Sequence, residues 1–262
     1  MKTITIYQAD AFTDKLFGGN PAAVCPLQEW LPDEVMQQIA AENNLAETAF
    51  FIPKGHEFEL RWFTPTSEID LCGHATLATA HILFKHLGYQ ADSINFHTLK
   101  AGVLTVSLEE NVYTLNFPSQ MPLPCETPEG LIEALGGKKP AAVLRSSDYV
   151  LVYDTEEDIK AISPDFAALS KIKTVCVIVT ARGNTSDFVS RVFAPAVGIP
   201  EDPVTGSAHC SLIPYWADKL KKSKLYAFQV SARKGELWCE LSGDRVLISG
   251  KVVTYLKGEI YV

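Results

Sequence analysis

The residues best suited to chemistry lie in two glycine turns. The first turn reads Cys72-Gly73-His74-Ala75, and the second reads Thr205-Gly206-Ser207-Ala208. A glycine at the entrance to a helix leaves backbone N–H groups accessible, and the helix end carries a partial positive charge. Each turn is therefore suited to binding an anion such as a carboxylate. The alternative is that both glycines serve only tight packing where a strand meets a helix.

Glu47 is the third feature whose residue type is suited to chemistry. It lies in the segment Asn44-Leu45-Ala46-Glu47-Thr48-Ala49-Phe50, where most of its neighbours are apolar. A carboxyl group in apolar surroundings keeps its proton more readily than in water, which suits proton transfer near neutral pH. The corresponding segment of the second half, roughly residues 172–175, contains no carboxylate. The spacing equally allows a surface glutamate at the start of a strand.

Two other combinations of reactive residues are weaker. Cys72 and His74 supply half of a metal site, but no second Cys/His pair has a compatible spacing, so we expect no metal. Asp202, Ser207 and His209 are the residue types of a serine hydrolase. They lie within eight residues of one another, which makes triad geometry difficult, and the Gly-x-Ser-x-Gly motif is absent.

The two turns belong to a longer pattern that occurs twice. Arg61, Phe63 and Pro65 precede the first turn, and Arg191, Phe193 and Pro195 precede the second, about 130 residues later. Beyond the turns, residues 100–104 and 233–237 both contain a central glycine in matching register. A repeat of this length is too long for a solenoid unit. It predicts two related domains that face each other across a cleft.

Hydrophobic periodicity predicts the elements that position these residues. A helix should begin near Pro32 and end at 43–44, just before a strand at 48–52. Apolar helices should follow each turn, at 75–87 and up to about 222, with strands at 2–10, 22–25, 57–63, 93–98, 102–108, 111–117, 141–153, 174–180, 187–193, 225–231, 235–241 and 244–256. A proline-rich linker at 117–124 marks a domain boundary. We therefore expect an α+β fold with pseudo-symmetric domains at 1–120 and 121–262, each a mostly antiparallel sheet wrapped around a central helix.

Composition limits the possible classes of protein. With 47% hydrophobic and 21% charged residues, the chain is typical of a soluble globular protein, and it has no apolar run close to the roughly 18 residues of a membrane span. The formal net charge of −8 argues against a nucleic-acid or anionic-membrane surface. Six scattered cysteines without a Cys-x-x-Cys motif indicate free thiols in a reducing compartment. Since no signal peptide is recognisable, we expect a cytoplasmic location.

Several motifs together resemble the PhzF family of phenazine-biosynthesis-like proteins. They occur in the family's order and cover essentially the whole chain. These motifs are Asp10-Ala11-Phe12-Thr13, Gly19-Asn20-Pro21-Ala22-Ala23-Val24, Asn44-Leu45-Ala46-Glu47-Thr48-Ala49-Phe50, Arg61-Trp62-Phe63-Thr64-Pro65, Glu68-Ile69-Asp70-Leu71-Cys72-Gly73-His74-Ala75-Thr76 and Glu201-Asp202-Pro203-Val204-Thr205-Gly206-Ser207-Ala208-His209.

The resemblance implies the diaminopimelate-epimerase-like fold and an isomerase that needs no cofactor. The family's founding activity is the isomerisation of trans-2,3-dihydro-3-hydroxyanthranilate. Carried over to this sequence, the proton shuttle is Glu47, and the substrate contacts are Asn20, Gly73, His74, Asp202, Gly206 and Ser207. A homodimer is a further expectation for the family. Its relatives also suggest that the last strand, about 254–262, returns to pack on the first domain.

The asymmetry between the halves favours one mechanism. Racemisation needs an acid and a base on opposite faces, as the paired thiols of related epimerases provide. Cys72 occupies the first thiol position of that wider pattern, but Thr205 and its neighbours offer no second thiol. A single glutamate can instead remove a proton from one carbon and return it to another on the same face, which moves a double bond in a small carboxylate.

Two alternatives remain open. The first is a racemase or epimerase of amino or hydroxy acids, which would require a second base near Lys173 or Thr205. The second is a protein that binds a small carboxylate without converting it. Replacement of Glu47 distinguishes these classes, because only an enzyme has turnover to lose.

Overall fold

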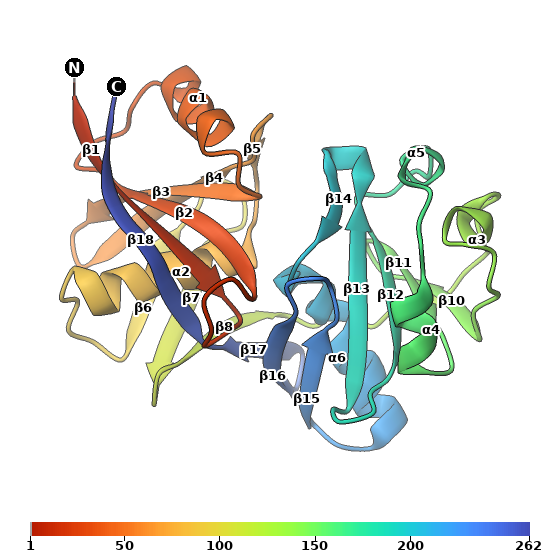
Figure 1. The fold of residues 1–262 in the computed structure, drawn as a ribbon. Coiled ribbons are helices and arrows are strands. Elements are labelled where there is room, and N and C mark those ends of the chain that lie inside the picture. Colours follow the sequence, from red (N-terminus) through yellow and green to blue (C-terminus); the bar gives the residue numbers. More distant parts are fainter. Residues whose placement is uncertain (1) are drawn as a thin grey trace. The chain divides into compact units, whose positions relative to one another are not determined.

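The chain forms two compact units, which a computed structural model describes for residues 2–262 (Figure 1). The first unit comprises residues 2–117 and 248–262, and the second comprises Pro118–Leu247. The sequence placed the boundary near residue 120. Strand β18 (Val252–Tyr261) pairs antiparallel with β1 (Thr3–Ala11), so the end of the chain completes the sheet of the first unit.

The first unit is built on a mixed sheet. Strands β1 and β2 are antiparallel, β2 and β3 are parallel, and β3 and β4 are antiparallel. Strand β4 then pairs antiparallel with the short β5 and parallel with β6, which continues antiparallel through β7 to β8. The remaining bounds are β2 (Asn20–Pro26), α1 (Asp33–Asn43), β3 (Glu47–Lys54), β4 (Glu57–Phe63), β5 (Glu68–Ile69), α2 (Gly73–His86), β6 (Ser93–His97), β7 (Val103–Glu109) and β8 (Val112–Pro118).

The second unit repeats this pairing order. Strands β10 and β11 are antiparallel, β11 and β12 are parallel, and β12 and β13 are antiparallel. Strand β13 pairs antiparallel with the short β14 and parallel with β15, which is antiparallel to β16. The bounds are β9 (Leu123–Pro124), α3 (Leu131–Ala134), β10 (Ala142–Arg145), β11 (Tyr149–Val152), α4 (Glu156–Ala161), α5 (Phe166–Leu169), β12 (Val177–Arg182), β13 (Phe188–Ala194), η1 (Pro195–Val197), β14 (Ile199–Asp202), α6 (Gly206–Leu220), β15 (Lys224–Gln229), β16 (Gly235–Ser242) and β17 (Arg245–Gly250).

Each unit has one long central helix. In α2 every residue from Gly73 to Leu83 is buried, and the helix contacts β1, β2, β3, β7 and β18. A helix that is apolar on all sides must be covered on all sides, which explains why the sheet wraps around it. Helix α6 holds the same place in the second unit and contacts β15 and β16. The predicted α+β class with a central helix in each half is confirmed.

The repeated Arg-x-Phe motif has a structural role in both units. Arg61 donates two hydrogen bonds to Glu68, and its guanidinium lies over the Phe63 ring at 5.2 Å. Arg191 makes the same paired bonds to Glu201 and lies 4.9 Å from the ring of Phe193. Two parallel N–H···O bonds fix both partners in one plane. The motif therefore anchors the segment that leads into each glycine turn.

Some element boundaries differ from those predicted. The strands predicted around 141–153 are the hairpin of β10 and β11, whereas 244–256 is divided between β17 and β18 at Lys251. Helix α2 begins at Gly73, two residues before the predicted start. The short α3, β5 and β14 were not predicted, because two to four residues carry no readable periodicity.

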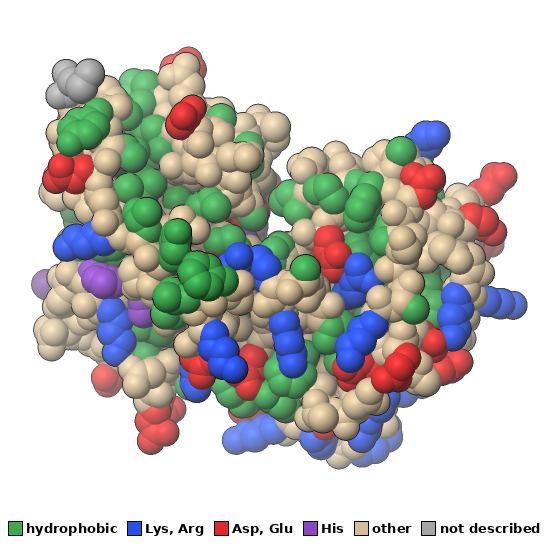
Figure 2. Space-filling model, viewed as in Figure 1, with side chains coloured by type: hydrophobic (Ala, Val, Ile, Leu, Met, Phe, Trp, Pro, Cys, Tyr) green, Lys and Arg blue, Asp and Glu red, His purple; other side chains and the backbone are tan. Residues whose placement is uncertain are grey.

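The surface carries both signs of charge. On the face seen in Figure 2, lysine and arginine side chains are interspersed with aspartate and glutamate. All six cysteines are free thiols. Among residues 2–262, no helix is both long enough and apolar enough to cross a membrane.

Candidate active site

Two parallel strands bring Asn20 and Glu47 to the same edge of the first unit. Each is the first residue of its strand, β2 and β3, and Ala22 lies opposite Glu47 in the register. Helix α1 connects the strands and ends at Asn44, whose left-handed backbone (φ 49°) lets its N–H bond to the carbonyl of Ala40. The sharp turn that follows places Glu47 at the start of β3.

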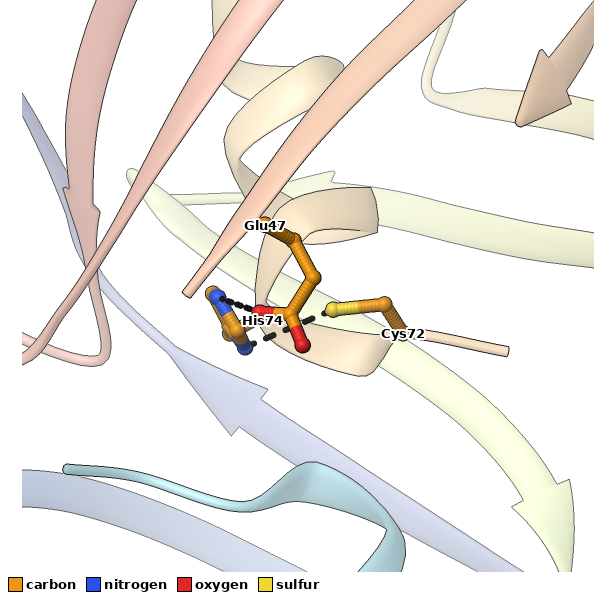
Figure 3. Close-up of side chains that lie close together, drawn as sticks. All are labelled: Glu47, Cys72 and His74. Carbon is orange, nitrogen blue, oxygen red and sulfur yellow. Dashed lines mark hydrogen bonds and ion pairs between the residues drawn. The ribbon is translucent and has the colours of Figure 1, made fainter. Parts of the chain in front are cut away.

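Helix α2 supplies the other two side chains of this cluster. Nε2 of His74 lies 3.0 Å from Oε2 of Glu47. Nδ1 of His74 lies 3.5 Å from Sγ of Cys72 and 3.1 Å from Nδ2 of Asn20. Figure 3 shows the imidazole in contact with both the carboxylate and the thiol. The four residues form one contiguous polar cluster.

Burial controls the electrostatics of this cluster. The exposed fractions are 6% for Glu47, 2% for His74 and 0% for Asn20. Burial, followed by the charge of Glu47, raises the pKa of the Cys72 thiol to about 11, so Cys72 is a protonated thiol at neutral pH. Burial alone would lower the pKa of His74, but the neighbouring Glu47 carboxylate outweighs it and raises the pKa above its ordinary value.

In the second unit, Gln229 hydrogen-bonds to the loop that precedes α6. The fully buried amide of Gln229 accepts a hydrogen bond from the backbone N–H of Thr205 at 2.8 Å. Its NH2 group donates to the Asp202 carbonyl at 2.8 Å and to Oγ1 of Thr205 at 3.1 Å. Ser231 donates to the carbonyl of Pro203 at 2.8 Å. Asp202, the predicted substrate contact, thus sits on a rigid loop.

Both long helices begin without a side-chain cap. Cys72 precedes α2 and Thr205 precedes α6, and neither side chain caps its helix. Threonine is normally a good cap, but the hydroxyl of Thr205 donates to the Asp202 carboxylate instead. The N–H groups at Gly73 and Gly206 therefore lie at helix ends of positive potential that no N-cap side chain occupies.

The strand register identifies the counterpart of Glu47 in the second unit. Thr48 lies opposite Phe63, and Val177 lies opposite the equivalent Phe193. The residue that precedes Val177 is Cys176, so it corresponds to Glu47. The sequence analysis placed the counterpart of Glu47 at residues 172–175, which is at least one residue too early. Burial, with a further contribution from Asp148, raises the pKa of the Cys176 thiol well above its ordinary value.

His209 does not behave as a catalytic base. Its Nδ1 lies 2.8 Å from the carbonyl of Thr205, one turn earlier in α6, and its ring packs against Phe188 at 5.8 Å. Complete burial lowers the pKa of His209 to about 4, so the ring is neutral at physiological pH. The hydrolase-like residue types near Ser207 are thus accounted for by helix packing.

The structure groups the predicted residues by unit. Asn20, Glu47, Gly73 and His74 come together in the first unit, while Asp202, Gly206 and Ser207 share one loop and helix start in the second. The sequence missed Gln229 and Cys176. No local pattern could have identified them, because Gln229 reaches its partners across 24 residues and Cys176 is placed by strand pairing.

Comparison with known proteins defines first a class and then a family. The fold is similar to that of a solved hydroxyproline epimerase from Agrobacterium vitis, with bound trans-4-OH-L-proline, which aligns over 98% of this chain and 92% of its own. The TM-score is 0.59 with 9% identity, which supports the fold alone.

The family follows from closer matches. The family model PhzC-PhzF, described as phenazine biosynthesis-like protein, matches residues 9–258. An uncharacterized isomerase of Pseudomonas aeruginosa is 52% identical over 259 residues, 99% of both chains. The crystal structure of a PhzF family protein from Enterococcus faecalis covers 100% of both chains with a TM-score of 0.96 and 46% identity. The chain belongs to the PhzF family, whose curated members include isomerases.

Proposed function

We propose that this protein is a cofactor-independent isomerase that moves a proton and a double bond in a small carboxylate. Glu47 removes a proton from one carbon, the double bond shifts, and the resulting carboxylic acid returns the proton to another carbon on the same face. The observation that carries this proposal is the buried Glu47 carboxylate, held 3.0 Å from His74 and matched in the second unit by Cys176 rather than by a second carboxylate.

The other predicted residues bind and orient the substrate in this proposal. Each helix end, at Gly73 in the first unit and at Gly206 in the second, offers N–H groups to which a carboxylate can bind. A helix end contributes about 0.3–2 kcal/mol to anion binding, which corresponds to roughly 2- to 30-fold in affinity. Within the first unit, Asn20 and His74 hydrogen-bond to an amine or hydroxyl of the substrate beside Glu47. Asp202 and Ser207 are the proposed substrate contacts of the second unit.

The proposal is tested by replacing Glu47, the proposed proton shuttle. Wild type and Glu47→Gln are incubated in deuterated water with a panel of small unsaturated and amino-substituted carboxylic acids, including dihydrohydroxyanthranilate, and the label is followed by NMR. We expect a moved double bond with deuterium at a single carbon. General acid–base catalysis contributes about 10²–10⁴-fold to the rate. Glu47→Gln should therefore be at least about 10²-fold slower, while its ligand affinity changes little.

A two-base racemase is the second candidate, and Cys176 is the observation that favours it. A thiol at the position equivalent to Glu47 is of the residue type that two-base enzymes employ. Deuterium at an inverted α-carbon, lost in both Glu47→Gln and Cys176→Ser, would favour this alternative over the one-base isomerase. Saturable binding without any exchange would instead indicate a carboxylate-binding protein.

A further inference from the structure

Three side chains of metal-ligating type converge in the first unit. Glu47 offers a carboxylate oxygen, Cys72 a sulfur and His74 a ring nitrogen, and these atoms all lie within 4.8 Å of one another (Figure 3). All three residues are buried. Borderline-soft divalent ions such as Zn²⁺ prefer this mixture of nitrogen, sulfur and oxygen ligands.

Two of these ligand atoms also lack a hydrogen bond. Among the described residues, Oε2 of Glu47 and Nε2 of His74 are buried polar atoms without a hydrogen-bond partner, although they lie 3.0 Å apart as an ion pair. The exposed fractions of the two side chains are only 8% and 3%. Buried polar atoms are normally hydrogen-bonded, and an ion is one of the usual reasons for an exception.

We propose that Glu47, Cys72 and His74 bind one transition-metal ion, with Zn²⁺ as the best fit. Zinc–ligand distances of about 2.0–2.3 Å in a tetrahedron place neighbouring ligand atoms about 3.3–3.5 Å apart. The ligand atoms of the cluster lie within 4.8 Å of one another, so the side chains must move closer together to reach this geometry. Three protein ligands leave a fourth position open for water or for a carboxylate of the substrate.

The two ring nitrogens of His74 face different neighbours. Cys72 Sγ and the Asn20 amide lie beside Nδ1, at 3.5 and 3.1 Å, whereas Glu47 lies beside Nε2 at 3.0 Å. Because one ion binds one ring nitrogen, the imidazole or the Glu47 carboxylate has to turn before all three ligands face the same ion.

The consequence is inhibition, and this part rests on the proposed function. A carboxylate that coordinates zinc cannot at the same time remove a proton from a substrate. Zn²⁺ should therefore switch the isomerase off with the same concentration dependence as its binding, and a chelator should restore activity.

Titration with Co²⁺ tests the binding step without any substrate. Tetrahedral Co²⁺ bound to a thiolate absorbs visibly and shows a sulfur-to-metal charge-transfer band in the near ultraviolet. We expect one equivalent per chain in wild type, with the band lost and binding at least tenfold weaker in Cys72→Ser. Cys125→Ser removes a more accessible thiol of the other unit and should leave both unchanged. Competition with Zn²⁺ should abolish the signal.

Three outcomes would overturn the proposal: no stoichiometric binding to wild type below about 10 μM, no charge-transfer band, or a band that survives Cys72→Ser. Because the wild-type titration is decisive on its own, a poorly folded variant does not block the test. Metal binding without turnover of any substrate in the metal-free protein would overturn the isomerase but not the site. Turnover that Zn²⁺ leaves unaffected would overturn the inhibitory role.

Discussion

At the scale of single residues, the central feature is the contact between Glu47 and His74. A buried carboxylate is costly unless a partner compensates its charge. His74 provides that compensation from the start of helix α2, with Asn20 and Cys72 on its other nitrogen. The imidazole therefore both stabilises the carboxylate and fixes its position, which are the two properties a proton shuttle requires.

Removal of this partner should impair catalysis and also lower the free energy of unfolding, because Glu47 is left as a buried carboxylate without its partner. We expect His74→Gln to lower kcat/KM by about 10²-fold or more, since Glu47 loses its positioning contact and the substrate loses a polar contact. His86→Gln is the matched control, because His86 lies on the same helix but outside the cluster. Steady-state kinetics with the substrate found in the deuterium experiment provides the measurement. Equal losses in both variants would contradict a specific role for His74.

At the scale of elements, the loop before α6 depends on close packing against β16. A Cβ atom added at Gly235 would lie 2.2 Å from Cγ2 of Val204, a fully buried residue of the loop. Its counterpart in the repeat, Gly102, has open space around it but a positive φ of 74°. The two glycines of the repeat are thus required for different physical reasons.

This contact gives a prediction for Gly235→Ala. Overpacking in a filled core typically costs about 1–3 kcal/mol, so we expect that loss in the free energy of unfolding, together with a higher KM as the Asp202 loop shifts. Gly258→Ala is the control, since its added Cβ would make only an ordinary contact of 3.7 Å. Val204→Ala in the same chain should restore part of the loss. Urea unfolding measures all three variants, and an unchanged midpoint for Gly235→Ala would contradict the packing argument.

At the scale of the whole molecule, the sheet of each unit is completed by a strand that comes, in the sequence, directly after strands of the other unit. Strand β9 follows β8 and pairs with β10, while β18 follows β17 and pairs with β1. The two units are therefore linked twice by the chain, at 117–118 and at 247–248. We expect them to unfold together, because loss of β18 would leave the first sheet without its edge strand.

Two buried histidines, one in each unit, should make this stability depend on pH. Burial lowers the pKa of both His81 and His209 to about 4, from about 6.5 in an unfolded chain. Between those values the unfolded chain binds protons that the folded chain does not. Their contribution to the free energy of unfolding should thus fall as the pH drops through this window, by up to about 1.4 kcal/mol per pH unit for each histidine.

Urea titrations between pH 7 and pH 4.5 measure this dependence. His81→Gln should reduce the slope of the free energy of unfolding against pH by the equivalent of about one proton. His56→Gln, which alters an exposed histidine, should leave that slope unchanged. A wild-type slope that His81→Gln does not alter would show that other groups are responsible. NMR titration should independently find both buried rings neutral at pH 6.

The sequence by itself determined the features that depend on short spacing. The repeated Arg-x-Phe and glycine motifs indicated two related halves, the apolar helices after each turn indicated wrapped sheets, and Glu47 stood out as a carboxylate among apolar neighbours. Only the tertiary structure decided the contacts between distant segments. The Glu47–His74 pair, the hydrogen bonds from Gln229 to the Asp202 loop and the identity of Cys176 as the counterpart of Glu47 all depend on strand register and side-chain packing. These are set by interactions across the chain, and local periodicity carries no information about them.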